Sequence, residues 1–185
     1  MEYQISTHRH YKGEANKMVR RFGTLLLALC VTQPLLSDGD SSPTKDHVGF
    51  PEGYQQSYTV LRSFVKEKQE QLVTVYGNQL AASVTETRQL PYPYGSILVM
   101  ETATLLNSDK KSKGKIVGLH VMRREPGFGA AYGKNRTGDW EYVEYRADKS
   151  YMTPPQGSSV CAECHVKAGS ARDFVYRGRF AEGSR

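Results

Sequence analysis

The feature that most constrains this chain is a pair of cysteines followed directly by a histidine near the C-terminal end: Cys161, Cys164 and His165. Their spacing, Cys-x-x-Cys-His, is the attachment signal of a c-type haem. Each thiol can bond to one vinyl group of the haem, and the adjacent imidazole can then bind the iron as an axial ligand. The sequence therefore predicts one covalently bound haem c and a fold built around it.

Two other uses of a Cys-x-x-Cys pair fit this chain less well. Half of a zinc site would need a second pair of cysteines, or a closely spaced pair of histidines after the first pair, and the chain has neither. A thioredoxin-like redox pair opens a helix early in a βαβ unit, and no βαβ pattern surrounds this motif. The other cysteine is Cys30, and the other histidines are His8, His10, His47 and His120.

The N-terminal part of the chain has the layout of a secretory signal. A basic run, Val19-Arg20-Arg21, precedes an apolar run from Phe22 to Val31, and a polar stretch follows Ser37. The apolar run is short for a transmembrane helix, and an uncleaved membrane anchor is the main alternative. We expect residues 1–37 to be an N-terminal extension plus secretory signal and the protein to be periplasmic. Export agrees with the haem motif, since haem is attached to such motifs on the outer side of a membrane.

The predicted signal also changes the cysteine count and the charge of the remaining chain. Cys30 lies inside the signal, so the remainder keeps only the two cysteines assigned to haem. The whole chain has a formal net charge of +6, and residues 1–37 hold five basic and two acidic side chains, which leaves +3 for the remainder. A charge of this size, without a basic motif, does not indicate a nucleic-acid partner.

The rest of the sequence predicts a single α+β domain. Residues 38–49, rich in Ser, Asp and Pro, are expected to be a flexible leader, and residues 50–185 the haem domain. Asn78 can cap a short helix that reaches Glu86, and a second short helix is expected to hold the haem motif. Alternating and apolar patterns predict an antiparallel β-sheet with strands over residues 57–64, 71–76, 96–107, 115–123 and 140–145.

Five short motifs accompany the haem motif along this domain: Phe50-Pro51-Glu52-Gly53-Tyr54, Tyr76-Gly77-Asn78, Gly95-Ser96-Ile97-Leu98-Val99, Thr137-Gly138-Asp139-Trp140-Glu141-Tyr142 and Asp173-Phe174-Val175-Tyr176. In this order and spacing, the chain resembles the cytochrome P-460 family, which includes the cytochromes c′-beta. The similarity covers roughly Phe50 to Phe180. It implies an antiparallel sheet with a C-terminal haem c, and a homodimer.

The resemblance also implies a choice between two activities. One branch of the family crosslinks a lysine to the haem and oxidises hydroxylamine. The cytochrome c′-beta branch lacks the crosslink and binds nitric oxide or carbon monoxide at a five-coordinate iron. The crosslinking lysine corresponds to Met100 here, and the next lysine is Lys110. A thioether cannot form the crosslink, but it suits an apolar distal pocket.

Three hypotheses follow. The first is a haem protein that binds nitric oxide or a similar small gas, with Met100, Phe64 and Phe128 as candidate distal residues. The second is an enzyme that oxidises hydroxylamine or nitric oxide and passes electrons to a partner cytochrome. The third is an electron carrier with a sixth iron ligand. Candidates for that ligand are Met100, Met122, Met152 and His120.

Overall fold

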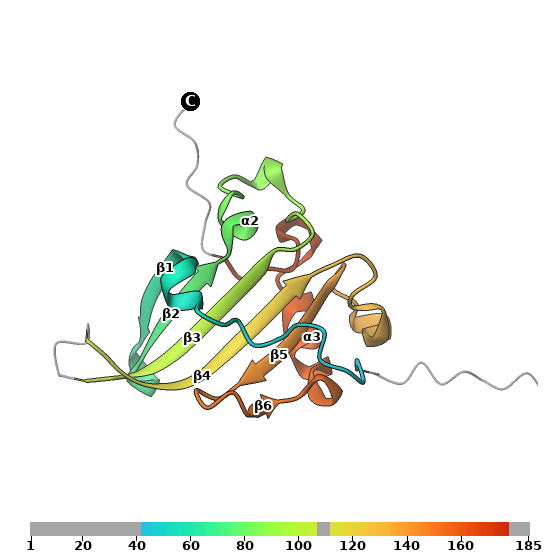
Figure 1. Ribbon diagram of the computed structural model, residues 1–185. Helices are drawn as coiled ribbons and strands as arrows, with labels where there is room; N and C mark the ends of the chain where they lie inside the picture. The colour runs from blue at the N-terminus through green and yellow to red at the C-terminus, as the bar shows by residue number, and fades with distance from the viewer. Residues whose placement is uncertain (1–41, 107–111, 178–185) are drawn as a thin grey trace, which may run out of the picture. The chain divides into compact units, whose positions relative to one another are not determined.

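A six-stranded antiparallel β-sheet forms the centre of the domain (Figure 1). The computed structural model describes residues 42–106 and 112–177. The strands are β1 (Thr59–Lys66), β2 (Gln71–Gly77), β3 (Ile97–Leu105), β4 (Lys113–Arg124), β5 (Trp140–Tyr145) and β6 (Tyr151–Thr153). The α-helices are α1 (Tyr54–Ser57), α2 (Gln79–Ala82) and α3 (Ser159–Val166), and the 3-10 helices are η1 (Glu67–Gln69), η2 (Thr87–Gln89), η3 (Ala130–Asn135), η4 (Pro155–Gly157) and η5 (Ser170–Arg172).

The strands follow one another across the sheet in chain order, and each pair of neighbours is antiparallel. This confirms the predicted α+β class with an antiparallel sheet and short helices. Two details differ from the prediction. Strand β6 was not expected, because three residues carry too little pattern to be recognised. Helix α2 ends at Ala82 instead of Glu86, because the backbone N–H groups of Thr85 and Glu86 donate to the Gln89 side chain and begin η2 instead.

Each face of the sheet carries its own apolar cluster, because side chains alternate between the faces along a strand. The N-terminal segment and α1 cover one face, which is nearest the viewer in Figure 1, and α3 lies behind the sheet. The first cluster comprises Val48, Tyr54, Tyr76, Val99, Leu119, Val121, Val143 and Tyr145. The second comprises Ala81, Val84, Tyr92, Leu98, Met122, Tyr132, Trp140, Tyr142, Ala162 and Val175.

The register of the sheet places four side chains side by side on the face toward α3. Val75 pairs with Met100, Met100 with His120, and His120 with Glu144, across strands β2 to β5. All four are half-buried. We call these four residues the floor row, because they lie beneath the site described below.

The described part of the predicted flexible leader, residues 42–49, is held against the domain. The Asp46 carboxylate accepts hydrogen bonds from the hydroxyl groups of Tyr145 (2.5 Å) and Tyr151 (3.1 Å). Flexibility was expected because Ser, Pro and Asp show no apolar periodicity. The contacts that hold this segment involve residues far along the chain, which leave no local pattern.

The predicted N-terminal extension and signal, residues 1–37, lie outside the described residues. Within residues 42–106 and 112–177, no helix is long and apolar enough to cross a membrane. The signal and the periplasmic location therefore stay predictions.

Glu101 is a carboxylate with 1% exposure on the face covered by α1. It accepts hydrogen bonds from the Tyr54 hydroxyl and from Gln55 Nε2 (2.6 Å), and it forms an ion pair with Lys113 Nζ at 2.8 Å. A buried carboxylate is costly unless such partners compensate for its lost hydration. Glu101 therefore joins α1 to β3 and β4.

We expect Glu101→Ala to lower the free energy of unfolding by about 2 kcal/mol, because it leaves the buried Tyr54 hydroxyl without an acceptor. Urea denaturation of the purified protein measures this change. Glu52→Ala is the matched control, because Glu52 and Lys149 form an ion pair between exposed side chains, which contributes little. Equal effects of the two substitutions would contradict a structural role for Glu101.

Candidate functional site

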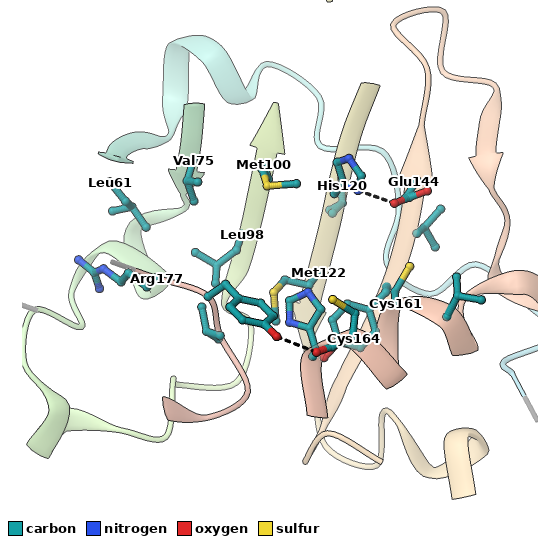
Figure 2. Close-up of a pocket in the computed structure, with 17 residues that line it drawn as sticks. Leu61, Val75, Leu98, Met100, His120, Met122, Glu144, Cys161, Cys164 and Arg177 are labelled. Atoms are coloured by element: carbon teal, nitrogen blue, oxygen red, sulfur yellow. Dashed lines mark hydrogen bonds and ion pairs between the residues drawn. The ribbon is translucent and has the colours of Figure 1, made fainter. Parts of the chain in front are cut away.

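A cavity of about 340 Å³ lies between the sheet and α3 (Figure 2). The floor row forms part of one wall, and Leu61, Leu98 and Met122 extend it. The facing wall comes from α3 and from residues 175–177 that follow it. The cavity is thus bounded by strands on one side and by the Cys-x-x-Cys-His motif on the other.

Helix α3 presents Cys161, Cys164 and His165 together. Residues separated by three and four positions lie on the same side of an α-helix, so these three side chains share one face. That face lines the cavity (Figure 2). Ala162, between the two cysteines, is fully buried in the core and anchors the helix to the domain.

The start of α3 is held by polar contacts beneath the helix. Pro154 and Pro155 lead into η4, where a fixed proline φ suits the first helical turn. The buried hydroxyl of Ser158 donates to the Pro155 carbonyl (2.6 Å) and lies 2.9 Å from the Tyr132 hydroxyl. These contacts position the first turn, which carries Cys161.

His165 has a defined orientation. Its Nδ1 lies 2.7 Å from the carbonyl oxygen of Phe174. A carbonyl can only accept, so Nδ1 carries the hydrogen and donates it. The imidazole packs between aromatic rings, with centroids 4.6 Å from Tyr142 and 5.4 Å from Tyr176. Burial lowers the pKa of His165, so at neutral pH the ring is neutral and its Nε2 lone pair is available to a metal.

The two cysteines are free thiols in different environments. Cys161 is half-buried and Cys164 is exposed, and no disulfide joins them. Burial raises the pKa of Cys161 to about 12, so it is a neutral thiol at neutral pH. Among the residues that the structure describes, no group of three or more His, Cys, Asp or Glu could hold a metal ion.

Most of the cavity wall is apolar. Leu61, Val75, Leu98, Met100 and Met122 all contribute to it from the sheet. The register of β1 and β2 shifts between the residues on either side of Leu61, so this residue is the extra one of a β-bulge.

One end of the cavity is polar. His120 Nδ1 and Glu144 Oε1 are paired across β4 and β5, and the Thr153 hydroxyl donates to the other oxygen of Glu144. The contact with His120 is the main cause that lowers the pKa of Glu144, with Thr153 adding to it. Glu144 is therefore ionised at neutral pH, and it holds the imidazole of His120 in place.

These residues fit a haem c. Two thiols and an imidazole with a free nitrogen share one helical face and line a largely apolar cavity. Such a surface suits the apolar macrocycle, and the donor set suits thioether attachment and axial ligation of iron. Two polar side chains of the lining, His120 and Glu144, are paired with each other.

The structure brings some of the predicted pocket residues to this cavity and leaves others away from it. Met100, Met122 and His120 line it, whereas Met152 does not. Phe64 and Phe128 were expected in the distal pocket, and both lie outside the lining.

The reasons are visible in the register and in local contacts. Phe64 pairs with Val73, two residues before Val75 in β2, and the Arg62 guanidinium lies 4.5 Å from the Phe64 ring centre. Phe128 lies in the loop after β4, where its ring packs 5.8 Å from that of His47 in the N-terminal segment.

Sequence reasoning missed two features of the site. Glu144 joins His120 only through the pairing of β4 with β5, and the predicted alternation of both strands could have suggested this neighbour. Tyr142 contacts His165 through the packing of α3 on β5, for which the sequence carries no local signal.

Comparison with known proteins agrees with this geometry. The family model described as Cytochrome P460 matches residues 51–177. No match was found among curated proteins. The matched region holds all six strands and the Cys-x-x-Cys-His helix, and it spans more than half of the chain. The chain therefore belongs to the cytochrome P460 family of c-type haem proteins.

Proposed function

We propose that this protein holds one haem, attached through Cys161 and Cys164 and ligated by His165, and that its five-coordinate iron binds nitric oxide or a similar small gas. The observation that carries the proposal is the cavity itself. An oriented, neutral histidine lies at one wall, and most of the remaining lining is apolar. A small uncharged ligand suits such a lining.

His165 supplies the proximal side of the site. Its hydrogen bond to the Phe174 carbonyl fixes the tautomer that leaves Nε2 free, and it increases the basicity of the ring. A bound haem supplies an iron atom with one axial position for His165 and another for an external ligand. The side chains around His165 hold the ring and exclude water from its face.

Three side chains of the cavity lining are potential sixth ligands. Met122 is buried in the core cluster with Leu98 and Tyr142, which disfavours its use as a ligand. His120 pairs with Glu144 through Nδ1, so its Nε2 is the nitrogen that a sixth ligand would use. Met100 packs in the floor row between Val75 and His120.

The second candidate function is oxidation of hydroxylamine or nitric oxide with electron transfer to a partner cytochrome. One observation favours it: the paired His120 and Glu144 could accept a proton from a protic ligand in the cavity. Against it, Met100 stands where the crosslinking lysine is expected, and no lysine is among the described residues that line the cavity. Gas binding therefore remains the first candidate.

Periplasmic location and homodimer formation complete the proposal. The basic and apolar runs before Ser37 support export. The dimer rests on the family resemblance alone.

The optical spectrum of the purified holoprotein tests the proposed function. We expect a broad high-spin band for the ferrous protein and a new band when nitric oxide is added, because a five-coordinate iron has room for the gas. A sharp low-spin spectrum that nitric oxide leaves unchanged would contradict the proposal and indicate an electron carrier. A far red-shifted ferrous band would instead indicate a haem crosslink and support the oxidase.

Met100→Leu separates a pocket residue from an iron ligand. Leucine keeps the apolar volume of the side chain but has no sulfur to donate, so we expect an unchanged ferrous spectrum and a similar nitric oxide affinity. Met122→Leu should likewise leave the ferrous spectrum unchanged. Met152→Leu is the control, because Met152 lies outside the cavity lining. Conversion of a low-spin wild-type spectrum to a high-spin one by either cavity variant would identify that methionine as the sixth ligand.

The ionised Glu144 predicts a specific pH dependence of stability. Its pKa is lowered in the folded protein, so the stabilisation is full above the ordinary carboxyl pKa and is lost as the pH falls through the lowered value. Glu144→Gln should therefore destabilise the protein at pH 7 and have a smaller effect in acid. Urea denaturation of both proteins at several pH values measures the difference. An effect of Glu144→Gln that persists at full size below the lowered carboxyl pKa would contradict the prediction.

A further inference from the structure

The loop after α3 returns the chain to the axial histidine through an uncommon backbone conformation. Asp173 and Phe174 both have positive φ values, of 49° and 59°. Two consecutive non-glycine residues rarely adopt this left-handed conformation, and a bulky residue such as Phe does so only where its surroundings impose it. The second of these residues supplies the carbonyl that accepts the hydrogen bond from His165.

Backbone hydrogen bonds close the loop but do not explain its direction. The Asp173 N–H donates to the Ser170 carbonyl (2.9 Å), and the Phe174 N–H donates to the Gly169 carbonyl (3.0 Å). Beyond the loop, the ring of Tyr176 packs on His165, and its hydroxyl donates to the Cys164 carbonyl (2.9 Å). The segment therefore folds back over the end of α3.

The Asp173 side chain ties this loop to a separate part of the domain. It is buried, and its Oδ2 accepts a hydrogen bond from the Tyr92 N–H at 2.9 Å. Arg124 Nε lies 3.7 Å from the same oxygen, and Arg124 Nη1 donates to the Tyr92 carbonyl. Asp173 is thus held by Tyr92, in the connection before β3, and by Arg124, at the end of β4.

We propose that Asp173 is a positioning residue for the axial ligand: its contacts with Tyr92 and Arg124 hold the left-handed corner at Asp173 and Phe174, which directs the Phe174 carbonyl to His165 Nδ1. The inference rests on the proposed role of His165 as iron ligand. Asp173 lies outside the cavity lining, and in this proposal it controls the strength of the bond between the iron and His165.

The chemical consequence follows from the hydrogen bond. When Nδ1 donates to a well-aligned carbonyl, the imidazole becomes a stronger donor at Nε2 and is held in one orientation. Stronger donation strengthens the bond from iron to histidine and stabilises the ferric state. Loss of the corner should weaken that bond and raise the midpoint potential.

The test compares Asp173→Ala with Asp139→Asn in the ferrous and ferric holoprotein. Asp139 is the control, because its carboxylate also lies near Arg124 (3.6 Å from Nη2). Unlike Asp173, it does not accept the hydrogen bond from the Tyr92 N–H. We expect Asp173→Ala to lower the iron–histidine stretching frequency in resonance Raman spectra and to raise the midpoint potential. Asp139→Asn should leave the stretching frequency at the wild-type value.

A second variant keeps the test decisive if Asp173→Ala does not retain haem. Asp173→Gly tolerates a positive φ but removes the carboxylate, and it should shift both quantities in the same directions. A loss of stability without any shift in the stretching frequency would overturn the proposal, since it would mean a structural role only. If the wild-type protein itself shows no iron–histidine stretch, His165 is not the axial ligand that the proposed function requires. That result differs from a failure of the role of Asp173 alone, in which the wild-type stretch is present and the variants do not shift it.

Discussion

The packing of α3 against the sheet is the contact on which the site depends. Cys161, Cys164 and His165 share the helical face that lines the cavity, and the buried Ala162 anchors the helix in the core. A haem attached to this helix would be confined by the strands opposite. Neither the helix nor the sheet could form such a site alone, because α3 is short and supplies one wall only.

The sheet contributes through its register. Pairing of β2 to β5 lines up Val75, Met100, His120 and Glu144, so a single row changes from apolar to polar along its length. The apolar part of the row suits an uncharged gas, whereas the polar end suits a protic ligand such as hydroxylamine. The row is therefore relevant to both gas binding and oxidation. The methionine in the row favours the first, as its thioether cannot form a lysine-type crosslink.

Much of this could be predicted from the sequence, because the informative patterns are local. The spacing of Cys161, Cys164 and His165 indicated the haem site, and alternation indicated the long strands. The partners of the site could not be predicted in the same way. Phe64 and Phe128 were chosen as aromatic residues without knowledge of register, and both lie outside the cavity lining. Asp173 reaches Tyr92 across a large separation in the chain, a contact that only the folded structure reveals.

The proposed site is a haem iron that has His165 on one side and no protein ligand on the other. Electron paramagnetic resonance of the ferric holoprotein at neutral pH measures the spin state of the iron and so tests this ligation. We expect a high-spin ferric signal, because the iron then has a single strong axial ligand. A wholly low-spin signal would mean that a second side chain ligates the iron, and the iron would not be open to a gas.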